Sequence, residues 1–85
     1  LADRVIPDDQ VYAASLEFCR QFVGGPAVAL RAAKEAIDRG TETDLESGLA
    51  LERTYFAAMF ATKDREIGME SFVANGPGKA VFEGR

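Results

Sequence analysis

Apolar residues recur every three to four positions in four successive stretches of the chain, and breaks rich in Gly, Pro, Thr and Asp separate these stretches. This spacing is typical of amphipathic helices that bury one face. The first predicted helix runs from a capping aspartate, Asp8 or Asp9, to about Val23. Gly24-Gly25 ends that helix, and a second, alanine-rich helix is predicted over residues 26–39, with Pro in its first turn.

Two further helices are predicted in the second half of the chain. A third helix is predicted to begin after Thr43 or Asp44 and to end near Ala61, with leucine, phenylalanine and methionine on its apolar stripe. Thr62 is the predicted N-cap of a fourth helix, in which Asp64 lies favourably against the positive end of the helix dipole. The sequence Gly76-Pro77-Gly78 ends this helix.

The predicted fold class is therefore all-α: a small domain of four helices joined by short connections. A short extended N-terminal segment, residues 1–6, precedes the helices and is expected to pair with protein outside this sequence. Residues 79–85 are predicted to form a short tail. Because 85 residues give a modest core, we expect one domain with a small stability margin.

Composition narrows the classes of function. The formal net charge is −4, which argues against nucleic-acid and membrane-surface binding, because those partners need a concentrated basic patch. The chain contains no histidine and one cysteine, Cys19, so we predict no metal site, no histidine-based catalysis and no internal disulfide. A chain without an internal disulfide or signal peptide is expected in a reducing compartment, and we predict a cytoplasmic, non-secreted protein.

Glu52 is the one acid that falls within the apolar stripe of the third helix. An unpaired carboxylate there would be costly, so we predict that Glu52 is paired, hydrogen-bonded or close to water in a cleft. A buried acid can serve as a general acid or base. A structural role is favoured, because no second acid, histidine or metal ligand shares its face.

The C-terminal end offers a second candidate site. Phe72, Lys79 and Arg85 bring one aromatic ring and two cations near a Gly-Pro-Gly turn. An adenine could stack on the ring while an ammonium group meets a phosphate. From the sequence alone, a phenylalanine at the position of Phe72 is more often a core or interface residue, and a lysine such as Lys79 is more often a solvated surface charge.

Three sequence blocks in order resemble the C-terminal region of the enoyl-CoA hydratase/isomerase (crotonase) superfamily. They are the opening LADRVIPDD, the segment GGPAVALRAAKEAIDRG and the stretch LALERTYFAAMFATKDREIGMESF. The last block matches the pattern L-x-x-E-R-x-x-F-x-x-x-F-x-T-x-D followed by G-M-x-x-F. The resemblance implies that residues 1–85 are a helical lid and oligomerisation domain, with the N-terminal catalytic domain absent from this sequence.

The resemblance also implies a function for the parent protein. It would hydrate or isomerise a 2-enoyl-CoA in fatty acid metabolism, with a coenzyme A thioester as substrate and no separate cofactor. The expected partners are the N-terminal crotonase domain and like subunits in a homotrimer or hexamer. Hydratase and isomerase chemistry remain open at this point, and the fragment alone is expected to be inactive because the family's catalytic acids lie in the other domain.

By resemblance, Phe56 matches a ring that lines the acyl end of the pocket, and Phe72 matches an aromatic near the coenzyme A nucleotide. Lys79 would be the cation for a phosphate, although the family's basic stretch lies closer to the Phe72 position. Ile67 stands where a glutamate is common in the family. The alternative from a different class is a free-standing helical interaction module that has no ligand.

Overall fold

The computed structural model describes residues 1–85, which form helices and connecting loops without β-strands. The all-α prediction with four α-helices is confirmed. The four α-helices, preceded by a 3₁₀ turn at Asp8–Gln10, are α1 (Val11–Arg20), α2 (Ala27–Gly40), α3 (Leu45–Met59) and α4 (Lys63–Asn75). No helix of this chain has the length and apolar character that crossing a membrane requires.

Two helices begin at the side-chain caps that the sequence indicated. The Asp44 carboxylate accepts a 2.9 Å hydrogen bond from the Ser47 backbone N–H at the start of α3. Hydrogen bonding from the Ser47 side chain and backbone lowers the pKa of Asp44. The Thr62 hydroxyl accepts a hydrogen bond from the Arg65 N–H and starts α4. Each cap satisfies an amide that would otherwise lack a partner in the first helical turn.

The first helix differs from its prediction. Neither aspartate caps it: Pro7 leads into the 3₁₀ turn, and α1 begins only at Val11. It also ends early, at Arg20, and a turn then leads to Gly24, whose φ of +79° favours glycine. Amphipathic spacing cannot distinguish a last helical turn from a following non-helical turn with the same apolar residues, so the predicted end near Val23 is wrong.

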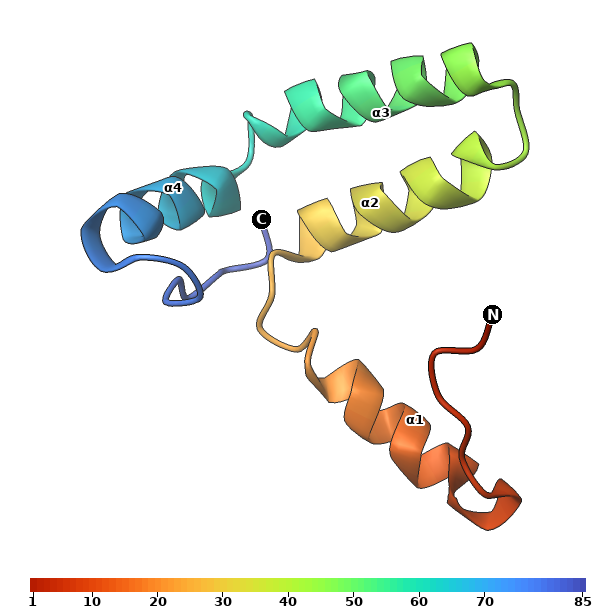
Figure 1. The fold of residues 1–85 in the computed structure, drawn as a ribbon. Helices are drawn as coiled ribbons and strands as arrows, with labels where there is room; N and C mark the ends of the chain where they lie inside the picture. Colours follow the sequence, from red (N-terminus) through yellow and green to blue (C-terminus); the bar gives the residue numbers. More distant parts are fainter.

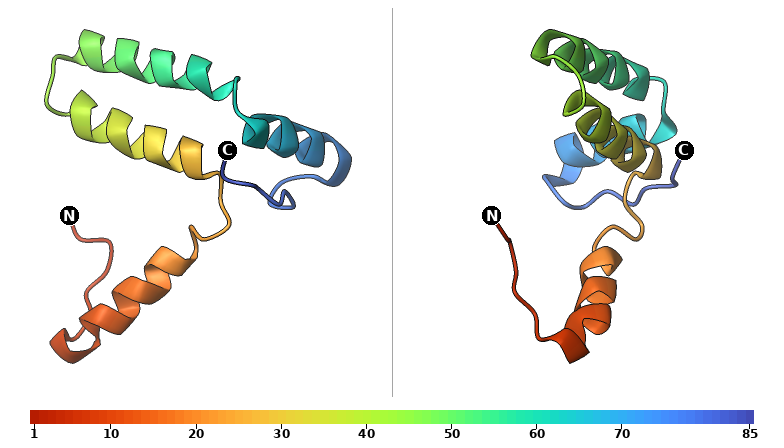
Figure 2. Two further views of the ribbon diagram at one scale, coloured as in Figure 1. Left: turned by 180° about the vertical axis from the view of Figure 1, so that it is seen from behind. Right: turned by 90° about the vertical axis from the view of Figure 1, so that its right-hand side faces the viewer.

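Helices α2 and α3 form an antiparallel hairpin, the one extensive helix–helix interface of the chain (Figure 1). The helices approach closely at Gly40 and Gly48, where a β-carbon added to Gly48 would lie 3.2 Å from the Gly40 carbonyl oxygen. Helix α1 projects away from this hairpin in both views of Figure 2, and the left view shows that α4 continues beyond the end of α3. The α2–α3 hairpin is therefore the one closely packed unit, and α1 and α4 extend from it with few contacts to other helices.

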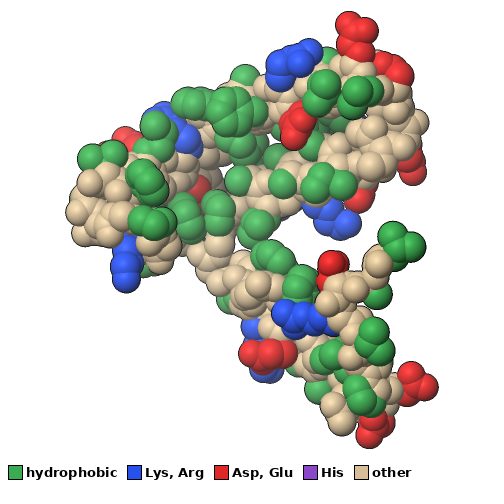
Figure 3. Space-filling view, viewed as in Figure 1, with side chains coloured by type: hydrophobic (Ala, Val, Ile, Leu, Met, Phe, Trp, Pro, Cys, Tyr) green, Lys and Arg blue, Asp and Glu red, His purple; other side chains and the backbone are tan.

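Few residues of this chain are buried. The three buried residues are Ala32, Gly48 and Asp64, and the Cα radius of gyration is 16.0 Å with extents of 42 × 38 × 20 Å. Large apolar side chains lie at the surface of every helix, among them Phe56 and Phe72, which are 69% and 62% exposed. Figure 3 shows apolar side chains along α1, over α4 and between α2 and α3.

The isolated chain is expected to self-associate or to bind a hydrophobic dye, because the large apolar side chains of its helices are mostly exposed. Analytical ultracentrifugation across a concentration series should give a rising average mass. A monodisperse monomer at high concentration that binds no dye would contradict this expectation and would indicate that the helices rearrange into a closed bundle.

Candidate functional site: the α2–α3 groove and the C-terminal cavity

An apolar groove of about 440 Å³ runs along the α2–α3 hairpin. Small residues of α2, such as Ala29 and Ala33, form one wall, because alanines let the backbones of neighbouring helices approach. Larger residues of α3, including Leu49 and Phe56, form the other wall. The groove can therefore accept an apolar group of moderate size.

Glu52 lies in this groove and is solvent-exposed in this chain. The expectation of a buried acid is wrong here, and the cleft alternative is the one that the structure supports. It lies on the apolar stripe of α3, as the periodicity indicated, and the α2 residues that line the same groove are small, such as Ala29 and Ala33. The Glu52 side chain takes part in none of the ion pairs of this structure.

Phe56 lies on the same wall, and its ring packs edge-on against the ring of Phe60, with centroids 5.4 Å apart and an interplanar angle of 73°. The Arg65 guanidinium lies 5.6 Å from the Phe60 ring centroid and donates hydrogen bonds to the Phe60 carbonyl. Phe60 is thus held at the junction of α3 and α4, while Phe56 presents its ring to the groove.

Tyr55 is a groove residue that the sequence analysis did not single out. Partial burial and the neighbouring Glu35 carboxylate raise the pKa of its phenol. The phenol therefore stays protonated at neutral pH and can donate a hydrogen bond. Tyr55 flanks the apolar stripe of α3 rather than centring on it, so hydrophobic periodicity gave no signal for this residue.

A second cavity, of about 320 Å³, lies between the α1–α2 turn, α4 and the C-terminal segment. Phe72 and Phe82 are among its lining residues, together with the turn Gly76-Pro77-Gly78. Lys79 follows this turn directly and is exposed. The structure therefore brings Phe72 and the residues on either side of Lys79 to one cavity, whereas Lys79 itself does not line it.

Asp64 has a larger role than the favourable dipole position that the sequence indicated. It is 4% exposed, and its carboxylate accepts hydrogen bonds from the backbone N–H groups of Glu83 (2.7 Å) and Gly84 (2.9 Å). Its own N–H donates to the Arg85 carbonyl at 2.9 Å. The Arg85 side chain pairs with Glu83 at 3.4 Å and does not line the second cavity. Residues 79–85 are therefore docked onto α4 through their last residues, 82–85, and are not a free tail.

The family described as enoyl-CoA hydratase/isomerase matches the chain over residues 1–85. The chain belongs to this family. Mouse mitochondrial methylglutaconyl-CoA hydratase is 41% identical over 69 residues, which is 81% of this chain and 22% of that protein. A probable enoyl-CoA hydratase of Rhizobium meliloti strain 1021 is 36% identical over 85 residues, covering the whole chain and 32% of its own length.

Solved structures agree with this assignment. An enoyl-CoA hydratase subunit from Geobacillus kaustophilus HTA426 superposes with a TM-score of 0.85 at 27% identity, covering 99% of this chain and 32% of that one. An enoyl-CoA hydratase from Bacillus anthracis gives a TM-score of 0.78 at 28% identity, covering 95% and 31%. The chain thus spans between about a fifth and a third of the length of these relatives.

Proposed function

We propose that residues 1–85 form the C-terminal helical part of an acyl-CoA-processing enzyme of this family, where they cover the acyl-CoA pocket and contribute to subunit contacts. The observation that carries the proposal is the apolar α2–α3 groove with an exposed Phe56 ring, in a chain that matches the family from end to end. The exposed apolar faces fit a role in which other parts of the enzyme cover them.

The parent reaction would be hydration or isomerisation of a 2-enoyl-CoA, with the coenzyme A thioester as substrate. Backbone amides outside this chain would stabilise the thioester oxyanion, and the N-terminal crotonase domain would supply the catalytic acids. Like subunits in a trimer or hexamer are the expected partners of the remaining apolar surface.

Within this enzyme Phe56 would contact the acyl chain, while Phe72 and Lys79 would meet the coenzyme A nucleotide. An aromatic ring can stack on adenine, and an exposed ammonium group beside the Gly76-Pro77-Gly78 turn can meet a phosphate. Glu52, exposed in the groove, would orient water or a neighbouring polar group and would not act as the catalytic acid.

The test is Phe56→Ala in the full enzyme that contains this segment. Removing the ring enlarges the acyl end, so the ratio of kcat/KM for a longer enoyl-CoA to that for crotonyl-CoA should rise about tenfold, the scale of a changed apolar contact. Steady-state kinetics on a series of enoyl-CoA chain lengths measures this ratio.

Phe60→Ala is the matched control, because Phe60 contacts Phe56 but does not line the groove. It should lower stability and leave the chain-length ratio unchanged. An unchanged ratio in Phe56→Ala, or an equal change in both variants, would contradict the acyl-binding role and favour the alternative of a helical interaction module.

A further inference from the structure

Three hydrogen bonds join Asp64 to the last three residues of the chain. Two end on its carboxylate, from the N–H groups of Glu83 and Gly84, and one runs from its own N–H to the Arg85 carbonyl. Asp64 is the single charged side chain that this structure buries. Burying a carboxylate is costly unless it is hydrogen-bonded, so this attachment is a specific one.

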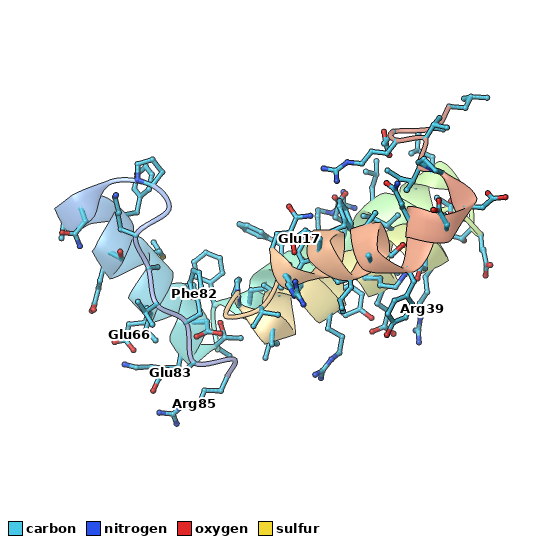
Figure 4. All side chains as sticks on the ribbon, turned by 90° about the horizontal axis from the view of Figure 1, so that it is seen from below. Glu17, Arg39, Glu66, Phe82, Glu83 and Arg85 are labelled. Carbon is cyan, nitrogen blue, oxygen red and sulfur yellow. The ribbon has the colours of Figure 1, made fainter.

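A second contact lies one helical turn further along α4. The Phe82 ring packs over Gly68, where an added β-carbon would lie 3.3 Å from the ring. Figure 4 shows Phe82 beside α4. Gly84, with a φ of +80°, passes close to Ala27 at the start of α2. The segment therefore fastens to α4 at two points and reaches α2 with its end.

This segment encloses the second cavity on one side. The other walls are the Gly24-Gly25 turn and the face of α4 that carries Phe72. Helix α4 makes no extensive contact with another helix, and the docked segment reaches α2 only where Gly84 lies near Ala27. A loosened segment would move the Lys79 backbone relative to Phe72.

We propose that Asp64 is a positioning residue for the coenzyme A nucleotide: it locks residues 79–85 onto α4 and thereby holds Lys79 and Phe72 in the arrangement that binds the nucleotide. The inference rests on the proposed function for the role of Lys79 and Phe72, whereas the lock itself rests on the contacts of Asp64. Asp64 touches no substrate in this arrangement.

The experiment compares wild type with Asp64→Asn in the full enzyme, using crotonyl-CoA and crotonyl-pantetheine, which lacks the nucleotide. An Asn amide nitrogen cannot accept one of the two N–H bonds, so the segment should open part of the time. If the fraction of molecules with the segment docked falls to about a tenth, KM for crotonyl-CoA should rise about tenfold with kcat little changed. The KM for crotonyl-pantetheine should stay the same. Hydrogen exchange in residues 80–85 should become faster.

Glu70→Gln is the matched control, because Glu70 is an exposed acid on the same helix. It should change neither KM nor exchange. An unchanged KM for crotonyl-CoA in Asp64→Asn, or an equal loss with both thioesters, would overturn the positioning role. If the wild-type enzyme itself uses both thioesters equally well, the nucleotide role of this segment in the proposed function fails, and the positioning role fails with it.

Phe82→Ala keeps the test decisive if Asp64→Asn does not fold. It removes the ring over Gly68 and leaves the Asp64 hydrogen bonds in place. The same selective rise in KM for crotonyl-CoA is expected. Failure of both variants to assemble, judged by circular dichroism and ultracentrifugation, would show that the contact serves folding and would overturn a local positioning role.

Discussion

The isolated 85-residue chain is expected to leave crotonyl-CoA unhydrated, with no loss of its absorbance above the buffer rate. The α2–α3 groove holds one acid, Glu52, which is exposed and without a charged partner. General acid–base catalysis by one positioned group contributes only about 10²–10⁴-fold, far below the acceleration that enzymes reach.

The measurement requires a preparation free of host hydratase, and Glu52→Gln of the same chain is the matched control. Residual activity that is equal in both samples would point to contamination. Activity in the wild-type chain that the Glu52→Gln variant loses would contradict the prediction and would place Glu52 among the catalytic residues.

The fold was predictable where local chemistry sets it. Asp44 and Thr62 are good N-caps followed by apolar periodicity, and α3 and α4 begin where those residues indicated. The start of α1 was not predictable in this way, because Asp8 and Asp9 lie within a 3₁₀ turn whose geometry depends on Pro7.

The candidate sites were predictable only in part. Periodicity placed Glu52 within the apolar stripe of α3, but its exposure depends on which residues cover that stripe, and periodicity does not report this. The lock at Asp64 joins residues about twenty positions apart through backbone N–H groups, and these carry no sequence signature. Buried polar contacts of that kind depend on the folded structure and cannot be predicted from the local sequence.

Gly48→Val is expected to disrupt the α2–α3 hairpin. A β-carbon at Gly48 would lie 3.2 Å from the carbonyl oxygen and 3.4 Å from the Cα atom of Gly40, and backbone atoms cannot move aside as a flexible side chain can. Overpacking at a buried site typically costs about 1–3 kcal/mol, a large share of the stability of so small a chain. Urea unfolding followed by circular dichroism, at equal protein concentrations, measures the loss.

Gly40→Ala is the matched control on the other side of the same contact. A β-carbon there would lie 3.9 Å from the Gly48 Cα atom, an ordinary van der Waals distance, and Gly40 has no positive φ. Alanine also favours helix over glycine, so this variant should unfold at the same urea concentration as wild type or a higher one. The asymmetry between two facing glycines is the decisive result. Equal losses in both variants would mean that the helices lie closer at Gly40 than the structure places them, and no loss in either would mean that α2 and α3 do not pack through these residues.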